Sequence, residues 1–427
     1  MGGGRGAFEA FAGSIGIWLV RALWAWIVLL AFQPTLGCSA GVLVIVALGL
    51  AMTMLGIGTY CIYKVIFTGI GVWGNSNTVC WAWDITNFVW WIGIGHAGTL
   101  ISAILRLVNA GWRRPVTRCA EVITAFALMI GAMFPIIHLG RPWLFFWLMP
   151  YPSSRLIWPN FRSPLVWDFF AITTYLTGSV LFLVLPMLPD FALVRDRTTG
   201  TRQKIYGALA LGWQGTPKQW HRLESAMSIM AIAIIPVAVS VHTIVSFDFS
   251  MAPVPMWHST MFGPYFVAGA IFSGIAGLII AMAALRKFLP IEEYLHPVHF
   301  QNLGKLLLMM SLLWGYFVFA ERLTVWYGNE SAEIQVLRAT QKGSFAPLYW
   351  TMVVVNFVIP VTILSIKRLP TITGSVLASC VMTVGRRRSG FLNVVPSRGH
   401  KSATAPAARC PAQRWARRGH CARVRPA

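Results

Sequence analysis

Long apolar runs separated by short polar segments dominate this sequence. Eight of them reach the length of about 20 residues that crosses the hydrocarbon core of a membrane. They predict spans at 41–70, 84–108, 119–139, 165–188, 221–247, 262–285, 301–327 and 346–366. The pattern therefore predicts an all-α fold, a polytopic transmembrane helix bundle within a domain at 41–368.

The two ends of the chain follow different patterns. Within 1–40, a Gly-rich start precedes an apolar stretch at 14–32 that Arg21 interrupts, so an interfacial helix and an extra span both stay open. Residues 369–384 look like a truncated, span-like stub. Residues 385–427 are rich in Arg, Ala and Pro and contain no acid, which predicts a disordered segment. It is either a basic cytoplasmic tail or an out-of-frame translation of the gene end, and the lack of any motif favours the second.

Composition supports a membrane protein and gives it an orientation. Charged residues make up 11% of the chain, far below the quarter or so of soluble proteins. Twenty Trp and ten Tyr fit aromatic belts at two interfaces. The net charge of +22 comes from the tail and from loops after the second, fourth, sixth and eighth spans, which places those loops in the cytoplasm and indicates no nucleic-acid partner. We expect a multi-pass protein of a bacterial inner membrane.

The first candidate site joins two consecutive spans. One apolar segment ends at His138, with Arg141 just beyond it, and the next opens with Asp168. Ionisable groups at membrane depth usually indicate function. A quinol gives up two electrons and two protons, so it needs an apolar slot, a His that bonds one hydroxyl and a carboxylate that accepts a proton. Alternatively, the His caps carbonyls and the Asp meets a helix dipole.

Aromatic side chains near these groups could form the walls of the slot. They are Trp143, Phe145, Phe146, Trp147 and Trp167. The alternative for each of them is a membrane aromatic belt. We expect His138 and Asp168 to be catalytic and His138, Arg141, Trp143 and Asp168 to bind quinol.

Further ionisable residues occur at several depths in other spans. They are His96, Glu121, Glu224, His242, Asp248 and Glu321. Carboxylates and imidazoles at successive depths suggest steps of a proton path. The alternative is hydrogen bonding between helices, or a Glu–Arg pair closed on itself, as at Glu321 and Arg322.

Bound metal and haem are not indicated. The seven Cys are scattered singly, which disfavours a disulfide framework or metal cluster. A di-haem site needs two well-separated His on one helix, whereas His242 and His258 are separated by two prolines. We expect no intrinsic cofactor.

Several motifs in collinear order resemble a known family. They read GVWGNSN, WDITNFVWWIGIGHAGTLISAIL, FPIIHLGRPW, PNFRSPLVWDFFAI, LALGWQGTPKQWH, HTIVSFDF, WHSTMFGPYFVAGAIFSG and WYGNE. Over roughly residues 40–370 the chain resembles the NrfD/PsrC family of quinone-interacting membrane subunits, and within it the ActC subunit of alternative complex III.

The resemblance implies about ten helices in two four-helix bundles plus a pair, with no cofactor of the subunit's own. It implies oxidation of menaquinol or ubiquinol near the outer face and possible proton translocation. It also implies partners: an iron–sulfur (ActB-like) subunit, multihaem c-type cytochrome subunits and an ActF-like paralogue. His138 and Asp168 match positions associated with quinol, and His96, His242 and Asp248 match polar positions discussed as proton routes. The chain departs from the family after the eighth span, where two more helices are expected.

Two other functions remain open from the residues. A secondary transporter would show repeats with Gly/Pro-broken helices at matching positions, and no clear repeat is visible. A catalytically inactive membrane anchor would tolerate the loss of His138.

Overall fold

The computed structural model describes residues 40–73, 83–148, 161–366 and 371–404, and these residues form helices and connections without a β-strand. The first half contains α2 (Ala40–Thr68), α3 (Trp83–Leu107), α4 (Arg113–His138), α5 (Pro164–Val184), α6 (Leu188–Arg197) and α7 (Thr201–Leu209). The second half contains α8 (Pro217–Ser250), α9 (Phe262–Phe288), α10 (Pro297–Gly328), α11 (Ser331–Gln341), α12 (Ala346–Val353), α13 (Ile359–Ser365) and α14 (Ile372–Thr404). A π-helical turn, Val354–Val358, joins α12 to α13.

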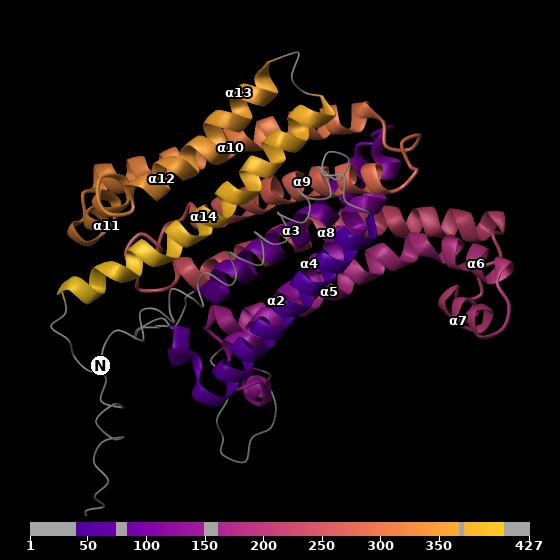
Figure 1. Cartoon of the computed structure of the whole chain (residues 1–427), viewed down its shortest axis with the longest axis horizontal. Helices are drawn as coiled ribbons and strands as arrows, with labels where there is room; N and C mark the ends of the chain where they lie inside the picture. Colours follow the sequence, from indigo (N-terminus) through magenta and orange to yellow (C-terminus); the bar gives the residue numbers. More distant parts are fainter. Residues whose placement is uncertain (1–39, 74–82, 149–160, 367–370, 405–427) are drawn as a thin grey trace, which may run out of the picture.

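The long helices run side by side along the longest axis of the molecule (Figure 1). Eight of the described helical segments are long and apolar enough to cross a membrane. The predicted helical membrane fold is therefore confirmed. The segment before α2 lies outside the described residues, so the choice between an interfacial helix and an extra span stays a prediction.

The helices pack as two groups. In the first bundle, α3, α4, α5 and α8 contact one another, and in the second, α9 and α10 pack with α12, α13 and α14. The contact between α3 and α9 joins the two groups. Small residues allow this close approach: a Cβ added at Gly274 of α9 would overlap the Cβ of Ala97 in α3.

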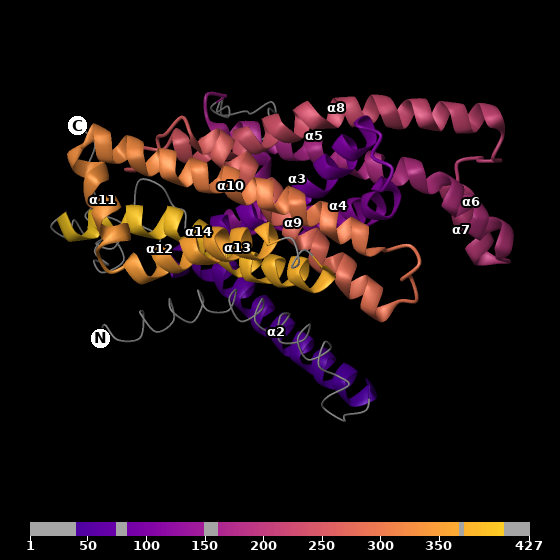
Figure 2. The ribbon, with the colours of Figure 1, turned by 90° about the horizontal axis from the view of Figure 1, so that it is seen from above.

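The helix α2 stands apart from both groups and projects away from them (Figure 2). It touches α4 only lightly, and large apolar side chains along it are exposed, among them Met52, Leu55 and Phe67. An apolar surface of this kind suits lipid or another membrane subunit.

The loop predicted between the fourth and fifth spans contains two helices. Here α6 and α7 carry the basic residues and lie at one end of the molecule, whereas α11 lies at the other (Figure 1). The next span begins with a capping box, in which the Thr216 side chain accepts a hydrogen bond from the Gln219 backbone N–H and the Gln219 side chain accepts one from the Thr216 backbone N–H. This fixes the start of α8 at Pro217, four residues before the predicted boundary.

The structure corrects the prediction for the segment after residue 369. Instead of a short stub and an unstructured tail from 385, α14 runs from Ile372 to Thr404 and packs against α9, α3, α12 and α13. Its buried face includes Ser375, Ala378, Ser379 and Ser389, along with Leu392 and Val394. Small and hydroxyl residues pack helices closely in membranes but give no apolar periodicity, which is why the pattern missed this helix. The rest of the predicted tail, 405–427, lies outside the described residues.

Candidate functional site

Three of the predicted residues lie at one end of the first bundle. There α4 ends at His138, α5 begins at Pro164 and α8 ends at Ser250, so we call this the His138 end. Asp168 is in the second turn of α5, and Asp248 is two residues before the end of α8. Antiparallel packing of consecutive helices therefore gathers these side chains at the same depth.

Asp168 and Asp248 face each other inside the bundle. Both side chains are buried, at 8% and 6% exposure, and each carboxyl group is close enough to affect the charge of the other. Oδ1 of Asp168 and both carboxyl oxygens of Asp248 are covered from solvent, and no hydrogen bond is described for these three atoms. An ionised carboxylate only accepts hydrogen bonds, so a bond between these two groups requires a proton on one of them. The pair can hold one proton between two acceptors.

His138 and the connection after it are more open. His138 is half-buried, Arg141 is exposed, and Trp143 is 58% exposed. Phe145 and Phe146 are likewise exposed, and Trp167 donates its indole N–H to the Phe161 carbonyl. Trp147 is placed in the short helix Pro142–Leu148. The predicted aromatic slot is therefore an exposed aromatic surface in this chain alone, and the ionisable neighbour of Asp168 is Asp248.

A pair of imidazoles lies deeper in the bundle. His96 of α3 and His242 of α8 are 3% and 2% exposed, and their Nδ1 atoms are 3.3 Å apart. Nδ1 of His96 also lies 2.9 Å from the Ile92 carbonyl oxygen. With two neutral rings facing through the same nitrogen, one Nδ1 must carry the proton and the other accept it. The arrangement lets a proton be shared between two helices.

Polar groups continue from the imidazoles along α3. The Tyr175 ring of α5 packs 4.0 Å from that of His96, and its hydroxyl donates to the His96 carbonyl at 3.2 Å. One turn further, the Thr99 hydroxyl reaches Ser179 at 3.4 Å. Next, Ser102 donates to Oε1 of Glu121 at 2.8 Å, and Oε2 of that buried carboxyl group is covered without a partner.

An ion pair closes the far end of this series. Arg106, near the end of α3, pairs with Glu224 near the start of α8, and its Nη2 also donates to the Glu224 backbone carbonyl at 3.3 Å. The Glu224 side chain is 63% exposed. We name the series from Asp168 and Asp248 through the imidazole pair and Glu121 to this ion pair the polar column. Asp248 and Glu224 are 24 positions apart on α8, about 36 Å at 1.5 Å per residue, which exceeds the hydrocarbon core.

Glu321 does not belong to the polar column. It is buried in α10, in the second bundle, where its carboxyl group lies near the charges of Arg322 and Glu333. The structure therefore gathers five of the six predicted proton-path residues in the first bundle and leaves Glu321 elsewhere.

Sequence reasoning missed the neutral members of the column. Tyr175 and Ser179 follow Asp168 at seven and eleven positions, which puts all three on one face of α5. Thr99, Ser102 and Arg106 likewise follow His96 on α3. The sequence signal that could have found them is a set of polar residues at helical spacing on the same face as a buried ionisable residue.

One group at the His138 end could hold a cation. Ligand atoms of His258, Glu330 and Glu333 all lie within 4.8 Å of one another, and Nε2 of His258 is 3.1 Å from the Glu333 carboxylate. A protonated His258 satisfies the same geometry as an ion pair, so the group does not by itself indicate a metal.

Comparison with known proteins places the chain in a family. Residues 71–396 match the family described as "Polysulphide reductase, NrfD". A protein of Halobacterium salinarum, provisionally named as a membrane subunit of dimethyl sulfoxide reductase, is 24% identical over 60% of this chain and 57% of its own length. A selenate reductase subunit of Mesobacillus selenatarsenatis is 27% identical over 52% of each chain.

A third relative covers more of the chain. The Hdr-like menaquinol oxidoreductase integral membrane subunit of Archaeoglobus fulgidus is 22% identical over 78% of this chain and 73% of its own length. The chain spans little more than half the length of the first two relatives, at 57% and 52%. The family match covers the first bundle, the polar column and most of α14, and eight helices are long and apolar enough to span a membrane. The chain is therefore a multi-pass integral membrane protein of the NrfD polysulphide reductase family.

Proposed function

We propose that this chain is the quinol-binding membrane subunit of a respiratory oxidoreductase complex. The observation that carries the proposal is the buried Asp168–Asp248 pair at one end of a polar column in an NrfD-family bundle. Buried carboxyl groups in a membrane protein are costly, and a site that must take protons from an apolar substrate is a reason to keep them. The name of the Archaeoglobus relative, which includes menaquinol, supports the same substrate class.

The chemistry assigns a role to each residue at the His138 end. Oxidation of one quinol to a quinone releases two protons and two electrons. His138 accepts the hydrogen bond of one hydroxyl and takes its proton, while the ionised member of the Asp168–Asp248 pair takes the other. Arg141 and Trp143 hold and cover the ring. Their exposure in this chain is what a site completed by lipid or a partner subunit would show.

The electrons leave through a neighbouring subunit. We propose an alternative complex III-like assembly, with an iron–sulfur subunit similar to ActB as the first acceptor, multihaem c-type cytochromes beyond it and an ActF-like paralogue beside this chain. The supporting observations are the collinear motifs and the exposed apolar face of α2. The Halobacterium and Mesobacillus relatives are both named as subunits of reductases, which makes them components of larger enzymes.

The polar column gives the protons a route. His242 and His96 are the next proton acceptors after Asp248 along the polar column. Glu121 and Glu224 follow them toward the end where Arg106 pairs with Glu224. We propose that protons travel along these side chains and the hydroxyl groups between them. Glu321 would belong to a separate path in the second bundle.

The first test is composition. The full chain, tagged and purified from membranes in mild detergent, should bring down iron–sulfur and c-type haem subunits identified by mass spectrometry. A stable chain that is purified alone would contradict the proposed complex and favour a transporter. If the subunits co-purify but His138→Ala and Asp168→Asn leave quinol oxidation unchanged, the chain is a membrane anchor without a catalytic role.

A further inference from the structure

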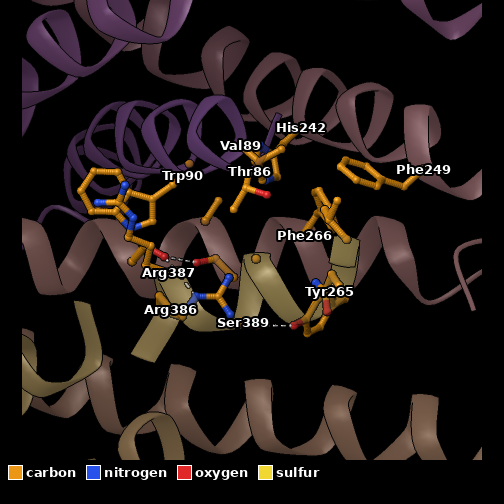
Figure 3. Close-up of a pocket in the computed structure, with 17 residues that line it drawn as sticks. Thr86, Val89, Trp90, His242, Phe249, Tyr265, Phe266, Arg386, Arg387 and Ser389 are labelled. Carbon is orange, nitrogen blue, oxygen red and sulfur yellow. Dashed lines mark hydrogen bonds between the residues drawn. The ribbon is translucent and has the colours of Figure 1, made fainter. Parts of the chain in front are cut away.

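A cavity lies where α3, α8, α9 and α14 meet, and Asp168 and Asp248 are not among the described residues that line it (Figure 3). Its volume is about 50 Å³, room for roughly three or four water-sized groups. Aromatic side chains line it, among them Trp90, Phe249 and Phe266. Two guanidinium groups, from Arg386 and Arg387, line the α14 side.

The two arginines have only neutral partners. Nε of Arg386 donates to the Ser273 hydroxyl at 3.2 Å, and its guanidinium lies 5.8 Å from the ring centre of Trp314. Nη2 of Arg387 donates to Oδ1 of Asn87 at 2.9 Å. Nη1 of Arg386 and Nε of Arg387 are covered from solvent and have no hydrogen-bond partner.

No negative charge balances these groups within the described part of the chain. The ion pairs found there do not include Arg386 or Arg387, and the described residues that line the cavity contain no Asp or Glu. His242, on the opposite side, adds no negative charge. Two adjacent positive charges in an apolar, membrane-embedded interior repel each other and lack hydration, so they need a counter-charge.

The backbone around the cavity makes space for the charged groups. A Cβ at Gly269 of α9 would overlap Nη2 of Arg386, so glycine at this position lets the guanidinium lie against the helix. The hydroxyl groups of Tyr265 and Ser389 are 2.8 Å apart at the cavity wall and add donors beside the arginines. The site thus combines two fixed cations, hydroxyl donors and a small, partly open volume.

We propose that this cavity binds one small monovalent inorganic anion of halide size, with Arg386 and Arg387 as its principal partners. The small volume and the two adjacent guanidinium groups favour a compact anion over a larger organic acid or a lipid phosphate with its chains. The bound anion neutralises the α14 charges where that helix packs on α9, and so stabilises the contact between α14 and the first bundle. The inference does not depend on the proposed quinol chemistry.

The test measures binding of radioactive chloride to the full chain, purified with its accompanying subunits, at constant ionic strength in gluconate. Wild-type protein should show saturable binding of about one chloride per chain, and its thermal midpoint should rise with chloride concentration. Arg386→Gln removes a charged donor and should weaken chloride binding about tenfold or more. Arg388→Gln changes an arginine two positions further along α14 and outside the cavity lining, so this variant should bind as wild type does.

The wild-type measurement alone can overturn the proposal. Non-saturable chloride uptake, with a thermal midpoint that does not respond to chloride, would mean that the cavity holds water only. Equal loss of binding in both variants would place the anion elsewhere. If Arg386→Gln does not fold, bromide-soaked wild-type crystals decide the location, because an anomalous peak beside Arg386 supports the site and a peak elsewhere overturns it.

Discussion

The buried carboxyl group of Glu121 depends on a single neighbour for its side-chain hydrogen bond. Glu121 is 3% exposed, and its one described side-chain donor is the Ser102 hydroxyl, at 2.8 Å. Substituting the donor therefore removes a hydrogen bond that water cannot supply at this buried position. The Glu121 carboxyl group is then left without a partner, which costs folding free energy.

Ser102→Ala should destabilise the protein by about 1–3 kcal/mol, the cost of leaving a buried acceptor unpaired. The measurement is the thermal or denaturant midpoint in detergent. The control is Ser228→Ala, whose hydroxyl bonds the Glu224 carbonyl on an exposed part of α8, and its effect should stay within about 0.5 kcal/mol. Equal shifts in the two variants would show that the Ser102–Glu121 bond does not matter for stability.

The candidate site was predictable as residues but not as contacts. The sequence singles out His96, His242, Asp168 and Asp248 because ionisable groups are rare in apolar runs. It does not pair them, since His96 and His242 are 146 positions apart and their meeting depends on how α3 and α8 are rotated. Both His242 and Asp248 are buried although they are not on one helix face, because α8 packs against α3, α5 and α9.

Helix contacts decide which glycines matter. On α9, Gly274 sits against Ala97 of α3, whereas Gly277, one turn later, has Ile94 as its nearest neighbour, 3.9 Å from an added Cβ. Both positions are glycines on the same helix, but only Gly274 lacks space for a Cβ.

Gly274→Ala should separate α3 from α9 and destabilise the protein by about 1–3 kcal/mol, as overpacking does. Gly277→Ala should be neutral or slightly stabilising, because alanine favours a helix over glycine. Thermal midpoints of both variants, measured in the same detergent, check the difference. Similar midpoints would contradict the close contact of α3 and α9.

The predicted helix boundaries were most accurate where the apolar pattern was strongest. The predicted spans at 84–108 and 262–285 agree with α3 and α9 to within a few residues, because apolar runs and flanking polar residues define them clearly. The start of α4 was placed six residues too late, since Arg113, Arg114 and Arg118 made its first turns look like a loop. The helix α14 was missed because serines and arginines occupy its packed face.

At the scale of the whole molecule, charge gives the orientation. The basic helices α6 and α7 and the segment with α11 lie at opposite ends (Figure 1). The positive-inside rule predicts that α6 and α7 lie in the cytoplasm and that α11, with the His138 end, lies outside.

Single cysteines test this orientation in a background whose seven native cysteines are replaced. Ser331→Cys, at the exposed start of α11, should react with a membrane-impermeant maleimide in intact cells. Thr199→Cys, exposed between α6 and α7, should react only after the membrane is permeabilised. The reverse labelling would place the His138 end in the cytoplasm and the proposed quinol chemistry with it.

Whole-molecule arrangement was only partly predictable. Eight spans and their alternation follow from the apolar runs, and the resemblance implied two bundles. The separation of α2 from both bundles did not follow. Its apolar sequence resembles that of any span, and only its light contact with α4 in the described chain distinguishes it.

The most direct test of the central claim is the rate of quinol oxidation by the purified complex after Asp168→Asn. Asparagine keeps the size of the side chain and one acceptor oxygen but cannot take a proton, so the turnover number should fall about a hundredfold or more while the subunits still co-purify. The matched control is Asp190→Asn, which removes an exposed carboxylate paired with Arg118 and should leave turnover unchanged. Wild-type turnover in an intact Asp168→Asn complex would contradict the account.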